Sequence, residues 1–255
     1  MQYVLENDEL YFMCALAGAD EVLGIGEPLE KIEKPTVEEK WNEVEKRLKN
    51  KQYITRESDG KKILKDDICL IVSVISFPNI VYSVTRRNSN GNKSTGHIYI
   101  KPYMCVHLET QDNKTYTINT YERIDDFKLF LSTYLNFINL KETDEKYFIS
   151  TTSKTIDYAL ECVNFGNLKK GVDIIADSGI SKREITEMLN AYSNVEKTIQ
   201  VSAFMNEEEK KEALFSISFN EKSTWMMKLT STDEFEKTSI YKSDKDEMIK
   251  ALFAF

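Results

Sequence analysis

The stretch that decides the fold is residues 80–121, IVYSVTRRNSNGNKSTGHIYIKPYMCVHLETQDNKTYTINTY. It contains segments that alternate polar and apolar residues or are rich in Val, Ile, Tyr and Thr, which is typical of half-buried strands. Turn-forming residues separate these segments at Asn90-Gly91, Lys101-Pro102 and Asp112-Asn113. We therefore predict an antiparallel meander of four strands, at Ile80–Arg87, Thr95–Lys101, Met104–Thr110 and Thr115–Tyr121.

The residues before the meander have the periodicity of helices. A first helix is predicted from Asn7 to about Gly18, and a linker with Gly24, Gly26, Pro28 and Pro35 follows it. A second helix begins near Thr36, because Val37, Trp41, Val44 and Leu48 then lie on one face. A hairpin around Asp59-Gly60 and a third helix from Asp66 to Ser76 come next. Helix, short hairpin and helix together predict a winged-helix-like unit.

The second half of the chain repeats this order. Helical patterns cover about Thr155–Val163, Leu168–Ala176 and the segment that opens with Ser181-Lys182-Arg183-Glu184, a capping box. Each meander is followed by an amphipathic helix with acids at its start, at Asp125-Asp126 and at Asp244-Lys245-Asp246. The strands of the second meander are predicted at Thr198–Met205, Ala213–Phe219, Thr224–Thr230 and Lys237–Lys242. We predict an internal duplication, with halves at 1–140 and 141–255 in one pseudo-two-fold domain.

Composition and charge narrow the function. The chain has 255 residues, and 41% of them are apolar, which is enough to build a hydrophobic core. Its formal net charge of -8 argues against general binding to the phosphates of nucleic acids. Its longest apolar run, residues 68–78, is shorter than the roughly 20 residues that span a bilayer. Residues 1–20 lack the basic start of a signal peptide. We therefore expect a cytoplasmic protein with reduced core cysteines, at Cys14, Cys69, Cys105 and Cys162, each of which lies within an apolar pattern.

The sequence offers little for catalysis. Nucleophilic catalysis needs a histidine base, but His97 and His107 both fall in predicted strands of one meander. His97, Cys105 and His107 are close in sequence, yet ordinary strand positions explain them better than a zinc site does. Neither GxGxxG nor GxxxxGK[ST] occurs to cradle a phosphate. We predict a protein that is not an enzyme and that holds neither cofactor nor metal.

DNA binding by a winged-helix-type transcriptional regulator is the alternative function. The cations near the two helical units are Arg56, Lys61, Lys62, Lys182 and Arg183. The acids beside them are Glu38, Glu39, Glu43, Glu45, Glu184 and Glu187. Both faces are therefore close to neutral, whereas a DNA-reading helix is expected to be basic.

A family resemblance accompanies these patterns. The chain combines a first helix with the sequence LENDELYFMCALAG (residues 5–18), a unit of the form W-x-x-V-x-x-x-L-x-x-K-x-Y-I-x-x-x-x-D-G (residues 41–60), a Tyr/Ile-rich meander and a capped helix, all repeated once. In this it resembles a family encoded within type VII (ESX-type) secretion loci of low-GC Gram-positive bacteria. Its layout is also similar to that of the EspG chaperones of mycobacterial ESX systems, whose two halves share a central antiparallel sheet.

The resemblance implies an α+β fold and a cytosolic protein that holds a secreted substrate protein of the same locus before export. It carries no catalytic or binding motif, so no residue role comes with it. A secreted substrate itself would resemble a helical hairpin with a W-x-G turn, whereas the two tryptophans here stand in Trp41-Asn42-Glu43 and Trp225-Met226-Met227. We therefore predict a chaperone or adaptor that is a monomer or a homodimer.

The candidate protein-binding residues are Trp225, Met226 and Met227. If they form a strand, successive side chains face opposite sides of the sheet, and at least one of these large groups faces away from a given core. The apolar run Ala251–Phe255 is a second candidate. Burial of both under helices is the competing interpretation.

Overall fold

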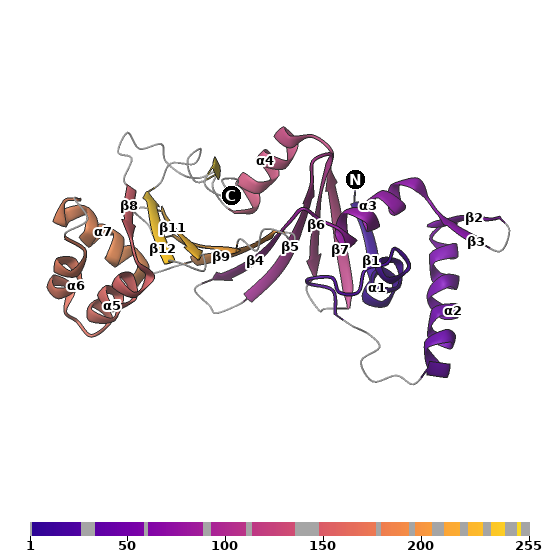
Figure 1. Cartoon of the computed structure of the whole chain (residues 1–255), viewed down its shortest axis with the longest axis horizontal. Helices are drawn as coiled ribbons and strands as arrows, with labels where there is room; N and C mark the ends of the chain where they lie inside the picture. The colour runs from indigo at the N-terminus through magenta and orange to yellow at the C-terminus, as the bar shows by residue number, and fades with distance from the viewer. Residues whose placement is uncertain are drawn as a thin grey trace. The chain divides into compact units, whose positions relative to one another are not determined.

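The computed structural model describes residues 2–26, 34–58, 61–88, 93–110, 114–135, 148–176, 180–193, 197–205, 212–219, 224–231, 236–242 and 249–250. The chain is α+β, with a large antiparallel sheet and several helices (Figure 1), as predicted. It divides into two compact units: the first is Met1–Ser83 with Thr95–Ile124, and the second is Val84–Ser94 with Asp125–Phe255. None of the helices within the described ranges is both long enough and apolar enough to cross a membrane.

The predicted first meander is confirmed. Its strands are β4 (Ile80–Asn88), β5 (Lys93–Lys101), β6 (Met104–Thr110) and β7 (Thr115–Tyr121). Sequence analysis missed one further strand, β1 (Gln2–Glu6), which pairs antiparallel with β7 so that Tyr3 lies opposite Ile118. In the first unit the strands therefore follow the order β1-β7-β6-β5.

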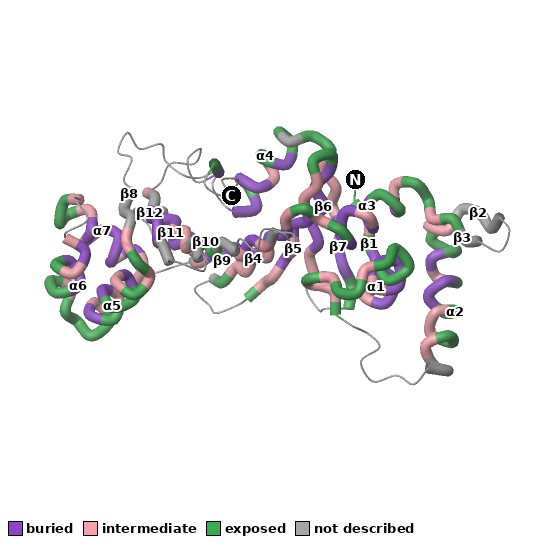
Figure 2. The backbone as a smooth tube through the Cα atoms, in the orientation of Figure 1, coloured by how far each residue is buried: buried purple, intermediate pink, exposed green. Residues whose placement is uncertain are grey.

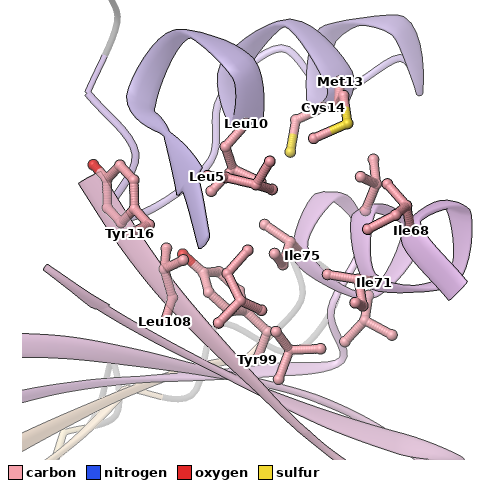
Figure 3. Close-up of a cluster of buried hydrophobic side chains, with 14 of the residues drawn as sticks. Leu5, Leu10, Met13, Cys14, Ile68, Ile71, Ile75, Tyr99, Leu108 and Tyr116 are labelled. Carbon is pink, nitrogen blue, oxygen red and sulfur yellow. The ribbon is translucent and has the colours of Figure 1, made fainter. Parts of the chain in front are cut away.

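The helices of the first unit also match the prediction. They are α1 (Asn7–Leu16), α2 (Lys34–Asn50) and α3 (Asp66–Ser76), with the hairpin strands β2 (Ile54–Ser58) and β3 (Lys61–Leu64) between the last two. Figure 3 shows α1 and α3 directing apolar side chains at Tyr99, Leu108 and Tyr116 of the sheet. Trp41 lies at the margin of this core, with its ring centroid 5.4 Å from that of Phe12.

Residues 17–26, predicted as part of a linker, lie on the core of the first unit. Ala19, Val22 and Ile25 pack against it. The hydroxyl of Tyr99 donates a hydrogen bond to the Leu23 carbonyl oxygen, and the hydroxyl of Tyr116 donates to that of Gly24 over 3.2 Å. Residues 19–26 form neither helix nor strand, as predicted for the start of the linker, but their packing on the core was not predicted, because two buried tyrosines supply long-range donors that no local pattern reveals. Pro28 lies outside the described residues.

The second meander is confirmed in the second unit. Its strands are β9 (Lys197–Met205), β10 (Glu212–Phe219), β11 (Thr224–Ser231) and β12 (Glu236–Lys242). A short strand that sequence analysis missed, β8 (Phe148–Thr151), pairs antiparallel with β12. Each meander is therefore extended by an added strand that precedes a helix in the chain, β1 beside β7 and β8 beside β12.

Helices α5 (Ser153–Asn164), α6 (Leu168–Ile175) and α7 (Lys182–Ser193) cover one face of the strands of the second unit (Figure 1). Their apolar side chains form a core with Trp225 and Ile240 of the strands. Among the described residues between α5 and α7 there is no strand, so this segment differs from the helix-hairpin-helix order of α2 to α3. Helix α4 (Ile124–Tyr134), which begins with two aspartates as predicted, belongs mostly to the second unit. The halves 1–140 and 141–255 stay a prediction.

Candidate protein-binding surface

The predicted binding residues lie on β11, and most of them are inaccessible. Trp225 and Met226 have none of their surface exposed. Trp225 and Met227 contact the core under α5, α6 and α7, while Met226 lies on the opposite face, across from Ile217 and Tyr241. Of the three, only the partly buried Met227 keeps some surface for a partner. Residues 251–255, the other candidate, lie outside the described part of the chain.

The most exposed large apolar side chain within the described residues is Phe165, with 88% of its surface in solvent. It is the C-cap residue directly after α5, at the start of the turn to α6, and Figure 2 shows this turn as exposed. A phenylalanine left in water forgoes about 1.5–3 kcal/mol of transfer free energy. A single exposed apolar side chain is common on protein surfaces, so Phe165 points to a contact only together with apolar neighbours.

The turn fixes the place of Phe165. The N–H of Asn167 donates to the Cys162 carbonyl over 2.8 Å and that of Gly166 donates to the Val163 carbonyl, also over 2.8 Å. This pair of bonds is a Schellman motif, and Gly166 supplies the left-handed residue it needs, with φ of 79°. The Asn167 side chain then caps α6 by accepting from the Lys170 N–H over 3.1 Å. Hydrogen bonds at the end of α5 and at the start of α6 therefore fix the backbone around Phe165.

A second aromatic side chain lies on the same side of α5. Tyr158 precedes Phe165 by seven residues, about two helical turns, so the two rings lie along one stripe. Tyr158 is 48% exposed, and the Lys170 ammonium lies 5.1 Å from its ring centroid. Glu161 is exposed between them on the helix. We call Tyr158, Glu161, Phe165 and Lys170 the α5–α6 surface.

Close backbone packing supports this surface from beneath. A Cβ added at Gly171 of α6 would stand 2.8 Å from the Ala159 carbonyl oxygen and 2.9 Å from a methyl group of Val163 on α5. Glycine at this position lets the two helices approach to backbone contact. Because the helices cannot slide without breaking that contact, the α5–α6 surface is preorganised for a partner.

The residues that could have served catalysis do not converge. In the register of β5 and β6, His97 lies opposite Leu108 and Ile98 opposite His107, so His97 faces the other side of the sheet from His107 and Cys105. Burial lowers the pKa of His97 to about 4 and raises the pKa of Cys105 to about 12. No group of metal-ligating side chains is found within the described residues. Of the four cysteines, Cys69 is exposed, contrary to the expectation of four core cysteines.

Four cations in or directly after α2 are engaged by acids, whereas the side chains of Arg56, Lys61 and Lys62 lie outside the described residues. Arg47 of α2 bonds to Asp8 over 2.6 Å, and Lys40 bonds to the same carboxylate over 3.0 Å. Burial alone would raise the pKa of Asp8, but these hydrogen bonds hold it below its usual range. Lys49 and Lys51 likewise lie at 2.8 Å from Glu45 and 2.6 Å from Glu9. These side chains are not free to meet phosphates.

Comparison with known proteins identifies the fold. No family model and no curated protein matches the sequence. Among solved structures, the chain is similar to the Mycobacterium tuberculosis type VII secretion system chaperone EspG5, solved in complex with a PE25-PPE41 dimer. The chain shares its fold with EspG5. The TM-score is 0.67 at 9% sequence identity, and the match covers 98% of this chain and 93% of the other.

Sequence analysis missed Phe165, although a signal for it exists. The apolar stripe of the predicted helix runs through Ile156, Ala159, Leu160 and Val163, and Tyr158 and Phe165 both fall off it at a spacing of seven. An aromatic residue directly before Gly166-Asn167, a helix-ending pair, stands at a helix terminus. Two aromatic residues on the polar side of one amphipathic helix indicate a second, outward-facing contact.

Proposed function

We propose that the protein is a non-catalytic cytosolic binding factor, a chaperone or adaptor for type VII secretion substrates. The observation that carries this proposal is the EspG5 fold along nearly the whole chain. The EspG5 structure contains a bound PE25-PPE41 dimer, so its fold is compatible with holding a folded client. By analogy, the client of this chain is a secreted protein of the same locus.

The α5–α6 surface is the part of the chain that we assign to the client. Its two exposed aromatic rings are the kind of side chain that dominates binding energy at protein interfaces. Because the surface is preorganised, little ordering cost opposes binding. The client segment that fits carries apolar side chains, which would cover Tyr158 and Phe165.

The test is co-expression of the chain with each small secreted protein encoded beside it, followed by calorimetry on the purified pair. We expect one stoichiometric complex of micromolar affinity or better, which corresponds to about -8 kcal/mol. Replacing Phe165 by Ser should weaken that complex at least tenfold, as expected for a central anchor. Phe77→Ser is the matched control, because Phe77 ends α3 in the first unit as Phe165 ends α5, and it is 48% exposed.

Deletion of the gene separates the chaperone from a regulator. A chaperone deletion should lower the soluble level or the export of the client while the transcripts of the locus stay unchanged. Changed transcription with an unchanged client level would instead favour the winged-helix alternative. We expect duplex DNA to bind no more tightly than about 10⁻⁴ to 10⁻⁶ M at physiological salt, because the α2 cations are held by acids.

A further inference from the structure

Strand β1 is an open edge of the sheet in the first unit. It ends the strand order of the described residues, with β7 as its one neighbour there. The Asn7 N–H donates to the Lys114 carbonyl over 2.7 Å, so Asn7 and Lys114 form a hydrogen-bonded pair. In an antiparallel ladder such pairs alternate, so Tyr3 and Leu5 also bond to β7. The main-chain groups of Gln2, Val4 and Glu6 therefore point away from the sheet.

Two of these outward groups are occupied by side chains. The Glu6 N–H donates to Glu9 Oε2 over 2.8 Å, and Lys51 Nζ lies 3.4 Å from the Val4 carbonyl oxygen that accepts from it. The ammonium of Lys51 is itself held 2.6 Å from the Glu9 carboxylate. Glu9 is fully buried, and Arg47 lies 3.4 Å from its other oxygen. The cation at the edge is thus fixed in place.

A fixed cation at an open edge has a specific physical effect. Edge strands present free N–H and C=O groups that pair readily with another strand, and a lysine placed there opposes pairing because the incoming strand would bury its charge. Val4 is the central outward residue, and its side chain is half exposed. An antiparallel copy of β1 would place Val4 opposite Val4 and Gln2 opposite Glu6, a self-complementary register.

We propose that Lys51 closes the β1 edge against a second copy of this chain, and that without it two chains associate through antiparallel β1 strands. This proposal is independent of the proposed function, because it concerns the first unit and self-association. The ion pair between Lys51 and Glu9 opposes assembly of two chains and takes no part in binding a client.

The test measures self-association of the full chain by analytical ultracentrifugation. Lys51→Met keeps the aliphatic stem and removes the charge. It also lowers stability, because the buried Glu9 loses its nearer cation and keeps Arg47 and the Glu6 N–H as partners. We expect this variant to dimerise at least tenfold more tightly than the wild type, and Lys51→Gln to do the same. Lys51→Arg should remain like the wild type, and so should Lys49→Met, because Lys49 pairs with Glu45 on α2 and not with β1.

A second substitution separates edge pairing from any other cause of association. Proline is tolerated in an edge strand where its missing N–H faces solvent, and the Val4 N–H faces away from β7. Adding Val4→Pro to Lys51→Met should therefore restore the monomer without unfolding the chain. Association of Lys51→Met and Lys51→Gln no stronger than that of wild type, or a dimer that survives Val4→Pro, would overturn the proposal.

Discussion

The two units pair their strands alike but hold their helices differently. In the first unit α2 is joined to α1 by charges, with Arg47 and Lys51 each 2.6 Å from a carboxylate of α1. In the second unit α6 meets α5 by backbone contact at Gly171. The ion pairs of the first unit use the long side chains of Arg47 and Lys51, whereas the contact at Gly171 uses no side chain of α6. The contact between α1 and α2 therefore depends on charge, and that between α5 and α6 on the absence of a side chain at Gly171.

The two tryptophans make this comparison measurable. Trp41 belongs to the first unit and Trp225 to the second, and the sequence contains no other tryptophan. With 5-fluorotryptophan incorporated, each unit gives its own ¹⁹F signal, and urea unfolding can be followed in both at once. Matched stability changes in the two signals would mean that the units unfold as one.

The largest effect is expected from Arg47→Met. The substitution takes one partner from Glu9, which is fully buried, and one from Asp8. Removing one partner of a buried ion pair costs about 3–5 kcal/mol, and we expect about 3 because Lys40 and Lys51 remain. The Trp41 signal should report this loss and the Trp225 signal a smaller one. A loss below about 1 kcal/mol would mean that the charges do not hold α2 to α1.

A pH effect in the first unit comes next. Burial lowers the pKa of His97 to about 4, so the folded chain stays neutral there while the unfolded chain takes up a proton near pH 6.5. The contribution of His97 to stability should therefore fall as the pH drops from about 6.5 to about 4 and stay constant below that. We expect about 2 kcal/mol from this group, since its ring is only partly shielded. His97→Gln should remove that part of the pH dependence, and an unchanged profile would contradict this assignment.

In the second unit we expect Gly171→Ala to cost about 1–2 kcal/mol. The new methyl group would stand 2.8 Å from the Ala159 carbonyl oxygen, and overpacking of this kind outweighs the gain in helix propensity. The Trp225 signal should move and the Trp41 signal should not. Lys169→Ala, on the exposed side of α6, is the control and should change stability by less than about 0.5 kcal/mol. A stabilised Gly171→Ala chain would refute the close-packing argument.

The smallest effect is expected from Asn167→Ala, which removes the cap of α6. The lost hydrogen bond to the Lys170 N–H should cost about 1 kcal/mol in thermal or urea unfolding. Asn167→Asp keeps an acceptor and should stay within a few tenths of the wild type. Equal losses in the two variants would show that the side-chain amide, and not the cap, matters.

Periodicity predicted most of the fold. The helices near residues 66–76 and 182–193 and the strands of both meanders lie where apolar spacing or alternation indicated them. Strands β1 and β8 were missed because they are only five and four residues long and owe their conformation to distant partners. The segment over residues 17–26 was missed for the same reason, since Tyr99 and Tyr116 hold it from far along the chain.

The binding surface was harder to predict than the fold. Trp225, Met226 and Met227 were candidates because alternation in a strand turns at least one of them away from a given core, but helices cover one face of β11 and Met226 is buried on the other. Which faces of a sheet are covered is set by tertiary packing, which strand alternation does not encode. Phe165, by contrast, lies outside through a local motif, the Gly166-Asn167 helix end, and such positions can be found from sequence.

The pairing of β1 with β7 also sets an order of events during synthesis. Because Gln2 lies opposite Asn119, the first strand to leave the ribosome waits for the last strand of its own unit. At about 5–20 residues per second, that wait lasts roughly 6 to 20 s. Throughout it, Leu5 and Leu10 have no sheet to cover them. Leu5 and Leu10 therefore stay exposed to aggregation and to holding factors during this wait, although both side chains are buried in the finished protein.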